Sequence, residues 1–256
     1  MANVSEYPYN NGMKHKEILV FNNSDRLVEC AIRKWSAIAG DALEQRGLFT
    51  VALSGGSSPV TLYEELSETG LKWDRTHIFI VDERFVPFDH NDSNYRMINE
   101  TLLSNINIPE QNIHPVPTEK GSSDEAAILY EKNILSFFNL SSGGIPEFDL
   151  LLLGLGDDGH TASLFPGSPA LNVKNRLVVS ATPPDISMHN RVSITFPVIN
   201  NARNIFFLVT GGNKAGVVKD VLENENSNFP AASVKPSKGK LFFLLGQHAG
   251  ALLSGS

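Results

Sequence analysis

Short apolar runs of strand length alternate with longer stretches of helical spacing along most of this chain. The clearest run, residues 148–153, is typical of a strand buried on both faces of a sheet. Such strands, separated by amphipathic helices, predict an α/β fold with an open, mostly parallel, Rossmann-like sheet and helices on both faces. The other predicted strands are residues 49–53, 77–81, 205–209 and 241–245, and the predicted helices are residues 24–43, 59–66, 94–103, 124–138, 213–222 and a last one ending near 253.

The length of 256 residues suits one large domain. We predict a single α/β domain over residues 17–256, preceded by a flexible, polar N-terminal segment at residues 1–16. That segment lacks the apolar centre of a signal peptide, and no run reaches the roughly 18 apolar residues of a membrane span. These features predict a cytoplasmic protein and leave its oligomeric state, monomer or dimer, open.

The charge balance argues against several classes of partner. Lys and Arg number 21 against 28 Asp and Glu, for a net charge of −7. Nucleic acids and membrane surfaces usually require a basic face, so neither is an expected partner, although a few local donors can still bind a small anion. The single cysteine, Cys30, excludes an intramolecular disulfide framework, and its apolar neighbours predict a buried, unreactive thiol.

A glycine-rich turn directly follows the first of these apolar strands. It comprises Ser54, Gly55, Gly56 and Ser57, and a helical stretch follows it. Glycines let the backbone approach a ligand, and successive N–H groups at the start of a helix can bind an anion. The turn therefore predicts either a phosphate site or an ordinary connection between a strand and a helix.

A second glycine-rich segment, residues 154–160, follows the buried strand at 148–153 and matches the spacing G-x-G-x-x-G. Asp157 and Asp158 oppose a dinucleotide site, because they would place negative charge beside the pyrophosphate. His160 next to a carboxylate instead suits acid–base chemistry, although a merely hydrogen-bonded loop histidine has the same pattern. No further histidine or cysteine at ligand spacing accompanies this pair, so we expect no metal there.

Three cationic side chains lie in loops near predicted strand ends. Arg84 follows the strand at 77–81 and could bind two phosphate oxygens, or could pair locally with Asp82 or Glu83. Arg191 alone has the appearance of a surface charge. Lys214 begins a predicted helix, where a cation is unfavourable unless an anion lies beside it. The three cations are therefore candidates for anion binding.

Taken together, these segments resemble the 6-phosphogluconolactonase family of the glucosamine-6-phosphate isomerase/6-phosphogluconolactonase superfamily. The resemblance covers nearly the whole chain from about Val51 and implies hydrolysis of 6-phospho-D-glucono-1,5-lactone in the pentose phosphate pathway, without a cofactor or a metal. The most specific motif is Gly-Leu-Gly-Asp-Asp-Gly-His-Thr-Ala-Ser-Leu-Phe-Pro at residues 154–166. Supporting motifs occupy residues 53–57, 82–87, 92–95, 191–200 and 212–215.

The resemblance also implies a role for each candidate residue. His160 would be the general base that activates water, and Asp158 would orient it. The phosphate and sugar hydroxyls would be bound by the turn of Ser54, Gly55, Gly56 and Ser57 together with Arg84, Arg191 and Lys214. The N–H groups of Gly156 and Gly159, or one of the cations, would stabilise the oxyanion. These roles require the three cations to form one compact positive cleft beside His160.

Two alternatives remain open. Deaminase/isomerases of the same superfamily, which act on glucosamine 6-phosphate, have a Glu five residues after the histidine, where this chain has Phe165. They also have Asp-Glu-Tyr where this chain has Asp-Glu-Arg at residues 82–84. One departure from the lactonases is Gly-Gln-His at residues 246–248, where an acidic residue is common. The other alternative is a non-catalytic sugar-phosphate-binding protein, which would have no need of both Asp158 and His160.

Overall fold

The computed structural model describes residues 16–119, 121–185 and 187–254. The predicted flexible segment therefore lies outside the described residues, except for Lys16, which is the first residue of strand β1. No helix of the described chain is long and apolar enough to cross a membrane.

The core of the fold is a seven-stranded sheet in which every pairing between neighbouring strands is parallel. This confirms the predicted α/β fold, and the central strands are buried as their apolar sequences require. In spatial order the strands are β1 (Lys16–Phe21), β10 (Lys240–Gly246), β9 (Asn204–Val209), β6 (Leu150–Leu153), β2 (Phe49–Leu53), β3 (Thr76–Ile80) and β5 (Ile113–His114).

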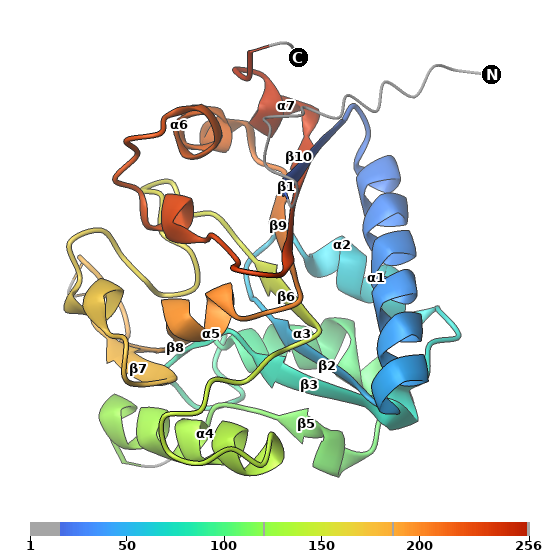
Figure 1. Cartoon of the computed structure of the whole chain (residues 1–256), viewed down its shortest axis with the longest axis vertical. Coiled ribbons are helices and arrows are strands. Elements are labelled where there is room, and N and C mark those ends of the chain that lie inside the picture. Colours follow the sequence, from blue (N-terminus) through green and yellow to red (C-terminus); the bar gives the residue numbers. More distant parts are fainter. Residues whose placement is uncertain (1–15, 120, 186, 255–256) are drawn as a thin grey trace.

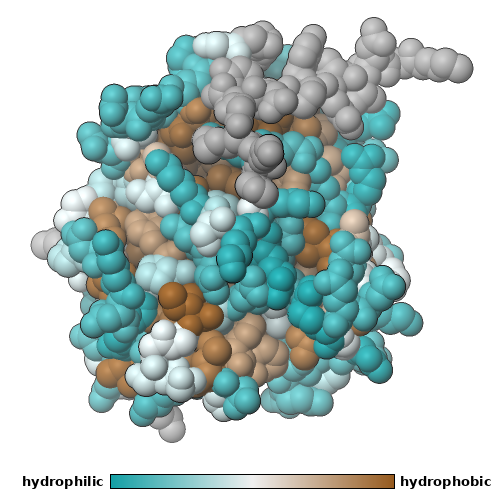
Figure 2. Space-filling model, viewed as in Figure 1, coloured by the Kyte–Doolittle hydropathy of each residue, from teal (hydrophilic) through white to brown (hydrophobic). Residues whose placement is uncertain are grey.

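Helices lie on both sides of this sheet (Figure 1). In that view α1 and α2 lie to the right of the strands, whereas α5 and α6 lie to the left. Figure 2 shows hydrophilic residues over most of the same face, with hydrophobic residues between them. The helices are α1 (Ser24–Arg46), α2 (Val60–Ser67), α3 (Asn94–Thr101), α4 (Ser123–Phe137), α5 (Phe196–Asn200), α6 (Ala215–Glu223) and α7 (Gln247–Gly250).

The longest helix, α1, begins and ends where its sequence indicates. The side chain of Asn23 accepts a hydrogen bond from the N–H of Asp25 at its start. Gly47 ends it in the left-handed conformation, with φ of 76°. Cys30 lies on the buried face of this helix, and burial raises the pKa of its thiol, in agreement with the predicted unreactive cysteine.

A second, smaller sheet was not predicted from the sequence. It consists of the antiparallel strands β4 (Asp82–Arg84), β8 (Arg191–Ile194) and β7 (Val178–Ala181). It continues from the main sheet, since the N–H of Ile194 donates to the carbonyl of Val81. Strands of only three or four residues are too short to show a clear apolar period, which is why sequence patterning missed them.

The order of the main sheet places a topological switch between β2 and β6. From β2 the chain runs outward to β3 and β5, and from β6 it runs in the opposite direction to β9 and β10. The loops that leave these two adjacent strands therefore separate and leave a crevice at their carboxyl ends, where open α/β sheets bind ligands.

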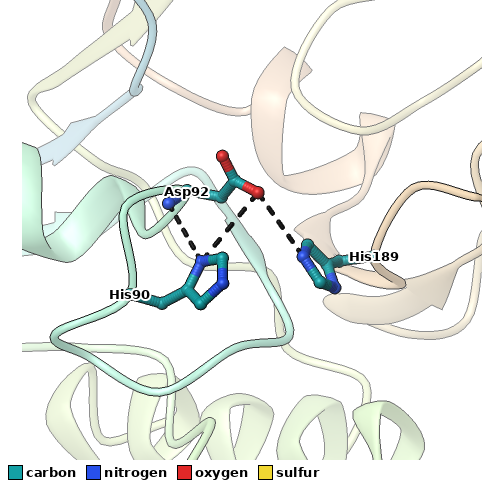
Figure 3. A group of neighbouring side chains, drawn as sticks. All are labelled: His90, Asp92 and His189. Atoms are coloured by element: carbon teal, nitrogen blue, oxygen red, sulfur yellow. Dashed lines mark hydrogen bonds and ion pairs between the residues drawn. The ribbon is translucent and has the colours of Figure 1, made fainter.

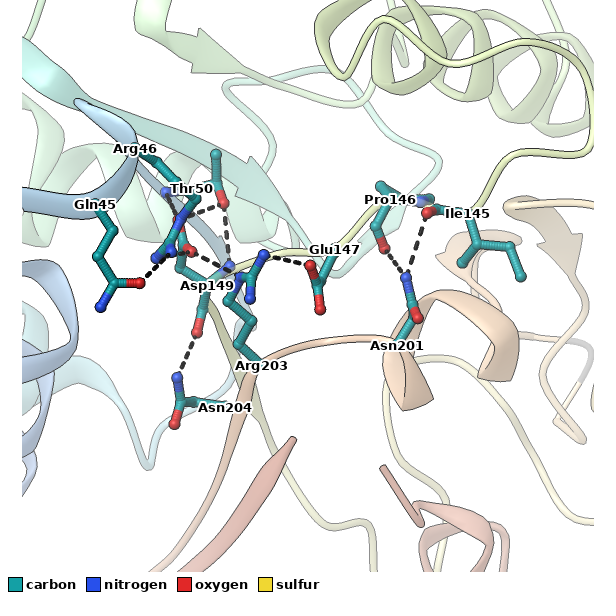
Figure 4. A network of polar contacts seen from close by, with 10 residues as sticks. All are labelled: Gln45, Arg46, Thr50, Ile145, Pro146, Glu147, Asp149, Asn201, Arg203 and Asn204. Carbon is teal, nitrogen blue, oxygen red and sulfur yellow. Dashed lines mark hydrogen bonds and ion pairs between the residues drawn. The ribbon is translucent and has the colours of Figure 1, made fainter. Parts of the chain in front are cut away.

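The opposite end of the sheet is held together by Asp149, the residue that directly precedes β6 (Figure 4). Its carboxylate is buried and accepts hydrogen bonds from the N–H and the hydroxyl of Thr50, each 2.9 Å long. Arg46 forms an ion pair with the second oxygen at 2.8 Å, and Nε of Arg203 lies 3.5 Å from it. One carboxylate thus joins the end of α1 to the beginnings of β2, β6 and β9.

We expect the substitution Asp149→Ala to lower the free energy of unfolding by about 3 kcal/mol, near the lower end for a broken buried ion pair, because both arginines are partly exposed. Urea unfolding followed by circular dichroism measures this loss. The control is Glu147→Ala, which removes a half-exposed ion pair to Arg203 and should cost about 1 kcal/mol or less. Equal losses in the two variants would contradict the central role of Asp149.

Candidate active site

A cavity of about 250 Å³ opens at the carboxyl ends of β2 and β6, in the crevice that the strand order creates. Most of the residues that sequence analysis singled out line it. Three predicted residues do not line it. Arg191 pairs with Arg84, Asp158 contacts His160, and Gly159 donates to the carbonyl of Gly156. The predicted residues that line the cavity are Ser54, Gly55, Gly56, Ser57, Arg84, Gly156, His160 and Lys214.

The imidazole of His160 is held by the carboxylate of Asp158. Nδ1 of the ring lies 2.5 Å from Oδ1 of Asp158, which also accepts the N–H of His160 at 3.1 Å. Because a carboxylate accepts hydrogen bonds, we assign the ring proton to Nδ1, and the lone pair of a neutral imidazole is then on Nε2. The pair is about one-third exposed, so His160 has the orientation and the access to solvent that a general base requires.

The loop that carries His160 depends on two glycines. A side chain at Gly156 would overlap Nδ1 of His160, and Gly159 has φ of +78° with the ring of Phe229 packed against it. The N–H of Gly156 donates to the carbonyl of His160, and the N–H of Gly159 donates to the carbonyl of Gly156. Both N–H groups thus already have acceptors within the loop, which weakens the prediction that they stabilise an oxyanion.

The glycine-rich turn after β2 has a conformation that other residues could not adopt. Gly56 has φ of +92°, and a side chain at Gly55 would overlap the amide of Asn94. That amide donates a hydrogen bond to the carbonyl of Asp82, so the turn and the start of α3 pack closely together. The turn leads into α2, whose first turn contains no acidic residue, and a bound anion would be favoured there.

Arg84 and Arg191 lie directly opposite each other on β4 and β8. Arg191 is buried, and desolvation together with the charge of Arg84 lowers the pKa of its guanidinium. Within the described chain no carboxylate lies within ion-pair distance of either group, and Arg84 donates instead to the carbonyl of Asp92 at 2.6 Å. Two adjacent cations without a paired carboxylate favour the binding of an anion.

Lys214 lines the same cavity as Arg84. It ends a short 3₁₀ helix, Gly212–Lys214, that leads into α6. Its ammonium group forms an ion pair of 2.6 Å with Asp157, which also accepts a hydrogen bond from Asn213. The expected misfit of a cation at a helix start is therefore already offset by Asp157, and it is weaker evidence for a bound anion than the arginine pair.

Glu83 is a residue of this region that sequence reasoning treated only as a possible partner of Arg84. Its side chain is fully buried and accepts the N–H groups of Arg84, Asn94 and Tyr95 at 2.7–2.8 Å. Burial raises its pKa to about 7, although these donors favour the ionised form. The carboxylate holds the start of α3 against β4 and so fixes the backbone of Arg84. Its position next to a strand end was the only signal in the sequence.

Phe165 lies against the catalytic candidate. Its ring is 4.8 Å from the imidazole of His160, centroid to centroid, and is buried. The position that carries a glutamate in the deaminase/isomerases is thus filled by an apolar ring. Asp82, a buried carboxylate that lines the cavity, accepts a hydrogen bond from the hydroxyl of Ser163 at 2.6 Å.

A parallel α/β fold with a His–Asp pair beside clustered cations at a topological switch point defines a protein suited to acid–base chemistry on a small anion. Residues 22–243 match the family described as glucosamine-6-phosphate isomerases/6-phosphogluconolactonase, and the chain belongs to this family.

Its relatives include several proteins named 6-phosphogluconolactonase. The protein of that name from Synechocystis sp. is 42% identical over 236 residues, which cover 91% of this chain and 97% of the relative. The one from Nostoc sp. is 42% identical over 215 residues, 83% of this chain and 88% of the relative. The solved structure of 6-phosphogluconolactonase from Trypanosoma brucei is 32% identical with a TM-score of 0.83, and the match covers 93% of this chain and 98% of that one.

We expect Glu83→Gln to lower the free energy of unfolding by about 1–3 kcal/mol. The NH2 group of the glutamine would replace one carboxylate oxygen, and the backbone N–H groups bound to that oxygen would lose their acceptor. Thermal unfolding measures the loss. The control Glu119→Gln alters an exposed carboxylate that accepts the N–H of Phe88, and its effect should be much smaller. A Gln variant as stable as the wild type would show that Glu83 does not hold α3 against β4.

Proposed function

We propose that this protein hydrolyses 6-phospho-D-glucono-1,5-lactone to 6-phosphogluconate, the lactonase step of the pentose phosphate pathway. The single observation that carries the proposal is the Nδ1–Asp158 contact, which leaves Nε2 of His160 free beside a cavity lined by cations. The names of the relatives agree with it. A sugar phosphate supplies the anion that the cations favour, and its lactone supplies a carbonyl that water can attack.

In the proposed mechanism, His160 accepts a proton from a water molecule at Nε2 while the water oxygen bonds to the lactone carbonyl carbon. Asp158 keeps the ring oriented and stabilises the imidazolium that forms. The bond from that carbon to the ring oxygen then breaks, and His160 returns the proton to the leaving ring oxygen. Atoms and charges balance, and no covalent intermediate is required because a δ-lactone is already an activated ester.

The binding roles follow the same geometry. Arg84 and Arg191, with the turn of Ser54, Gly55, Gly56 and Ser57, are proposed to bind the phosphate, and Lys214 the sugar end. The N–H groups of Gly156 and Gly159 already donate within their loop, so we propose that a cation lining the cavity stabilises the oxyanion. Lys214 would have to exchange Asp157 for the substrate.

Deaminase or isomerase activity on glucosamine 6-phosphate is less well supported. That chemistry would need a carboxylate where Phe165 packs against the base. A purely binding role would leave the His160–Asp158 pair without a purpose. We retain the further predictions that the protein acts in the cytoplasm, needs no cofactor or catalytic metal, and has neither nucleic acid nor membrane as a partner. Its net charge of −7 supports the last of these.

The function is tested by assaying the protein on freshly prepared 6-phosphogluconolactone and on glucosamine 6-phosphate, with spontaneous lactone opening subtracted. We expect activity on the lactone alone. His160→Ala should lower kcat by about 10²–10⁴-fold, because the general base is lost. The control His248→Ala alters an exposed histidine and should retain activity. Deamination of glucosamine 6-phosphate, or a fully active, folded His160→Ala variant, would overturn the proposal.

The phosphate role of Arg84 predicts a particular kinetic pattern. We expect Arg84→Ala to raise KM by about 10–100-fold with a smaller change in kcat, because a hydrogen bond to a charged group contributes about 1.5–3 kcal/mol in ground and transition states alike. Arg84→Lys keeps the positive charge but loses the two-pronged guanidinium group, so its KM should lie between those of the wild type and Arg84→Ala. A loss confined to kcat in steady-state assays would assign Arg84 to the reacting centre instead.

A further inference from the structure

A second cluster of titratable side chains lies beside the arginine pair, outside the cavity. It consists of His90, Asp92 and His189, and Figure 3 shows the two imidazoles next to each other, both directed at the same carboxylate oxygen of Asp92. Oδ2 of Asp92 lies 3.4 Å from Nε2 of His189 and 3.9 Å from Nδ1 of His90. One ligand atom from each residue lies within 4.8 Å of the other two.

These separations are close to those of a metal site. Tetrahedral coordination at about 2.0–2.1 Å places neighbouring ligand atoms about 3.3 Å apart. The two separations from Asp92 are close to this value, and the two ring nitrogens, which lie within 4.8 Å of each other, would have to move closer together. Nδ1 of His90 now accepts the N–H of Asp92 at 3.1 Å and would have to exchange that donor for the ion. All three side chains reach solvent, from which the ion and a water ligand can come.

The backbone around the cluster is already ordered by other contacts. Arg96 donates to the carbonyl of Asp89 and to the side chain of Asn91, which fixes the loop that carries His90 and Asp92. The N–H of Phe85 donates to the carbonyl of Asn190 at 2.7 Å, which ties His189 to the same region through β4 and β8. A site whose ligands are held before binding loses less entropy when the ion enters.

We propose that His90, Asp92 and His189 form a binding site for a divalent transition-metal ion of the Zn²⁺ class at the rim of the cavity. Two imidazoles and one carboxylate favour Zn²⁺, Co²⁺, Ni²⁺ or Cu²⁺ over Mg²⁺ and Ca²⁺, which prefer oxygen ligands. With three exposed protein ligands and cationic Arg84 and Arg191 nearby, affinity is lower than in a closed structural zinc site.

The bound ion would join two segments that are distant in sequence. Asp92 belongs to the loop between β4 and α3, and His189 lies two residues before the first residue of β8. The carbonyl of Asp92 accepts a hydrogen bond from Arg84, so the ion would also restrain the segment against which Arg84 rests. The site is therefore a stabilising clamp that is separate from His160, and lactone hydrolysis does not pass through it.

The test uses the full-length chain without a polyhistidine tag, dialysed against EDTA and then titrated with Co²⁺. We expect one equivalent to bind with visible d–d absorption, to be displaced by Zn²⁺ but not by Mg²⁺, and to raise Tm. Asp92→Asn and His189→Ala should each abolish the absorption and the shift in Tm. The matched control, Asp89→Asn, alters a neighbouring carboxylate outside the cluster and should bind Co²⁺ as the wild type does.

Three outcomes would overturn the site. The first is the absence of Co²⁺ absorption in the folded wild-type protein, and the second is equal binding by wild type and His189→Ala. The third is loss of Co²⁺ binding in His160→Ala with normal binding in His189→Ala, which would place the ion at the catalytic pair instead. Far-ultraviolet circular dichroism of each variant confirms that lost binding does not reflect unfolding. None of these results depends on lactonase activity, so the two proposals fail separately.

Discussion

Strands buried on both faces impose the constraint on which the rest of this molecule depends. Within β2 and β6 every residue is buried, so a charged side chain there would lose its hydration without compensation. Polar chemistry is therefore confined to the strand ends. At one end Asp149 joins three strands to α1, and at the other the chain opens into the loops that carry His160 and the glycine-rich turn. Ion pairs therefore hold the strands together at the Asp149 end of the sheet, and the opposite end contains the cavity that can bind a ligand.

The small antiparallel sheet determines the electrostatics of the open end. Pairing of β4 with β8 holds Arg84 opposite Arg191, and the two like charges repel each other. The arrangement is held in place by the strand pairing and by the buried carboxylate of Glu83, which accepts the N–H of Arg84. In the described chain neither guanidinium has a carboxylate at ion-pair distance. The charges of Asp82, Asp92 and Glu83 offset the repulsion in part, and a bound anion would relieve it further. The fold thus keeps two guanidinium groups side by side on a chain whose net charge is −7.

Much of the fold and the candidate site could be predicted from the sequence, and the reasons differ by element. The apolar strands and long amphipathic helices, such as α1, have clear periods and clear caps, and they were placed within a few residues. Strands β1, β4, β5, β7 and β8 were missed. The last four have only two to four residues, and β1, although it is longer, is an edge strand whose partner β10 lies more than 200 residues away in the sequence. The glycines at 156 and 159 were identified correctly as special, but sequence cannot show that their N–H groups bond within the loop.

Contacts between residues far apart in the sequence also explain why His160 could be predicted from the sequence and the role of Glu83 could not. His160 lies in a long local motif, with its carboxylate partner two residues away, so that contact is encoded within one turn of the chain. Glu83 acts through backbone donors ten or more residues away at the start of α3, and any buried polar residue could give the same local pattern. Lys214 is an intermediate case, because its partner Asp157 is distant in sequence yet belongs to the motif that was recognised. Asp157, which argued against a dinucleotide site, is thus the counter-ion of Lys214. An anionic substrate would compete with Asp157 for this lysine.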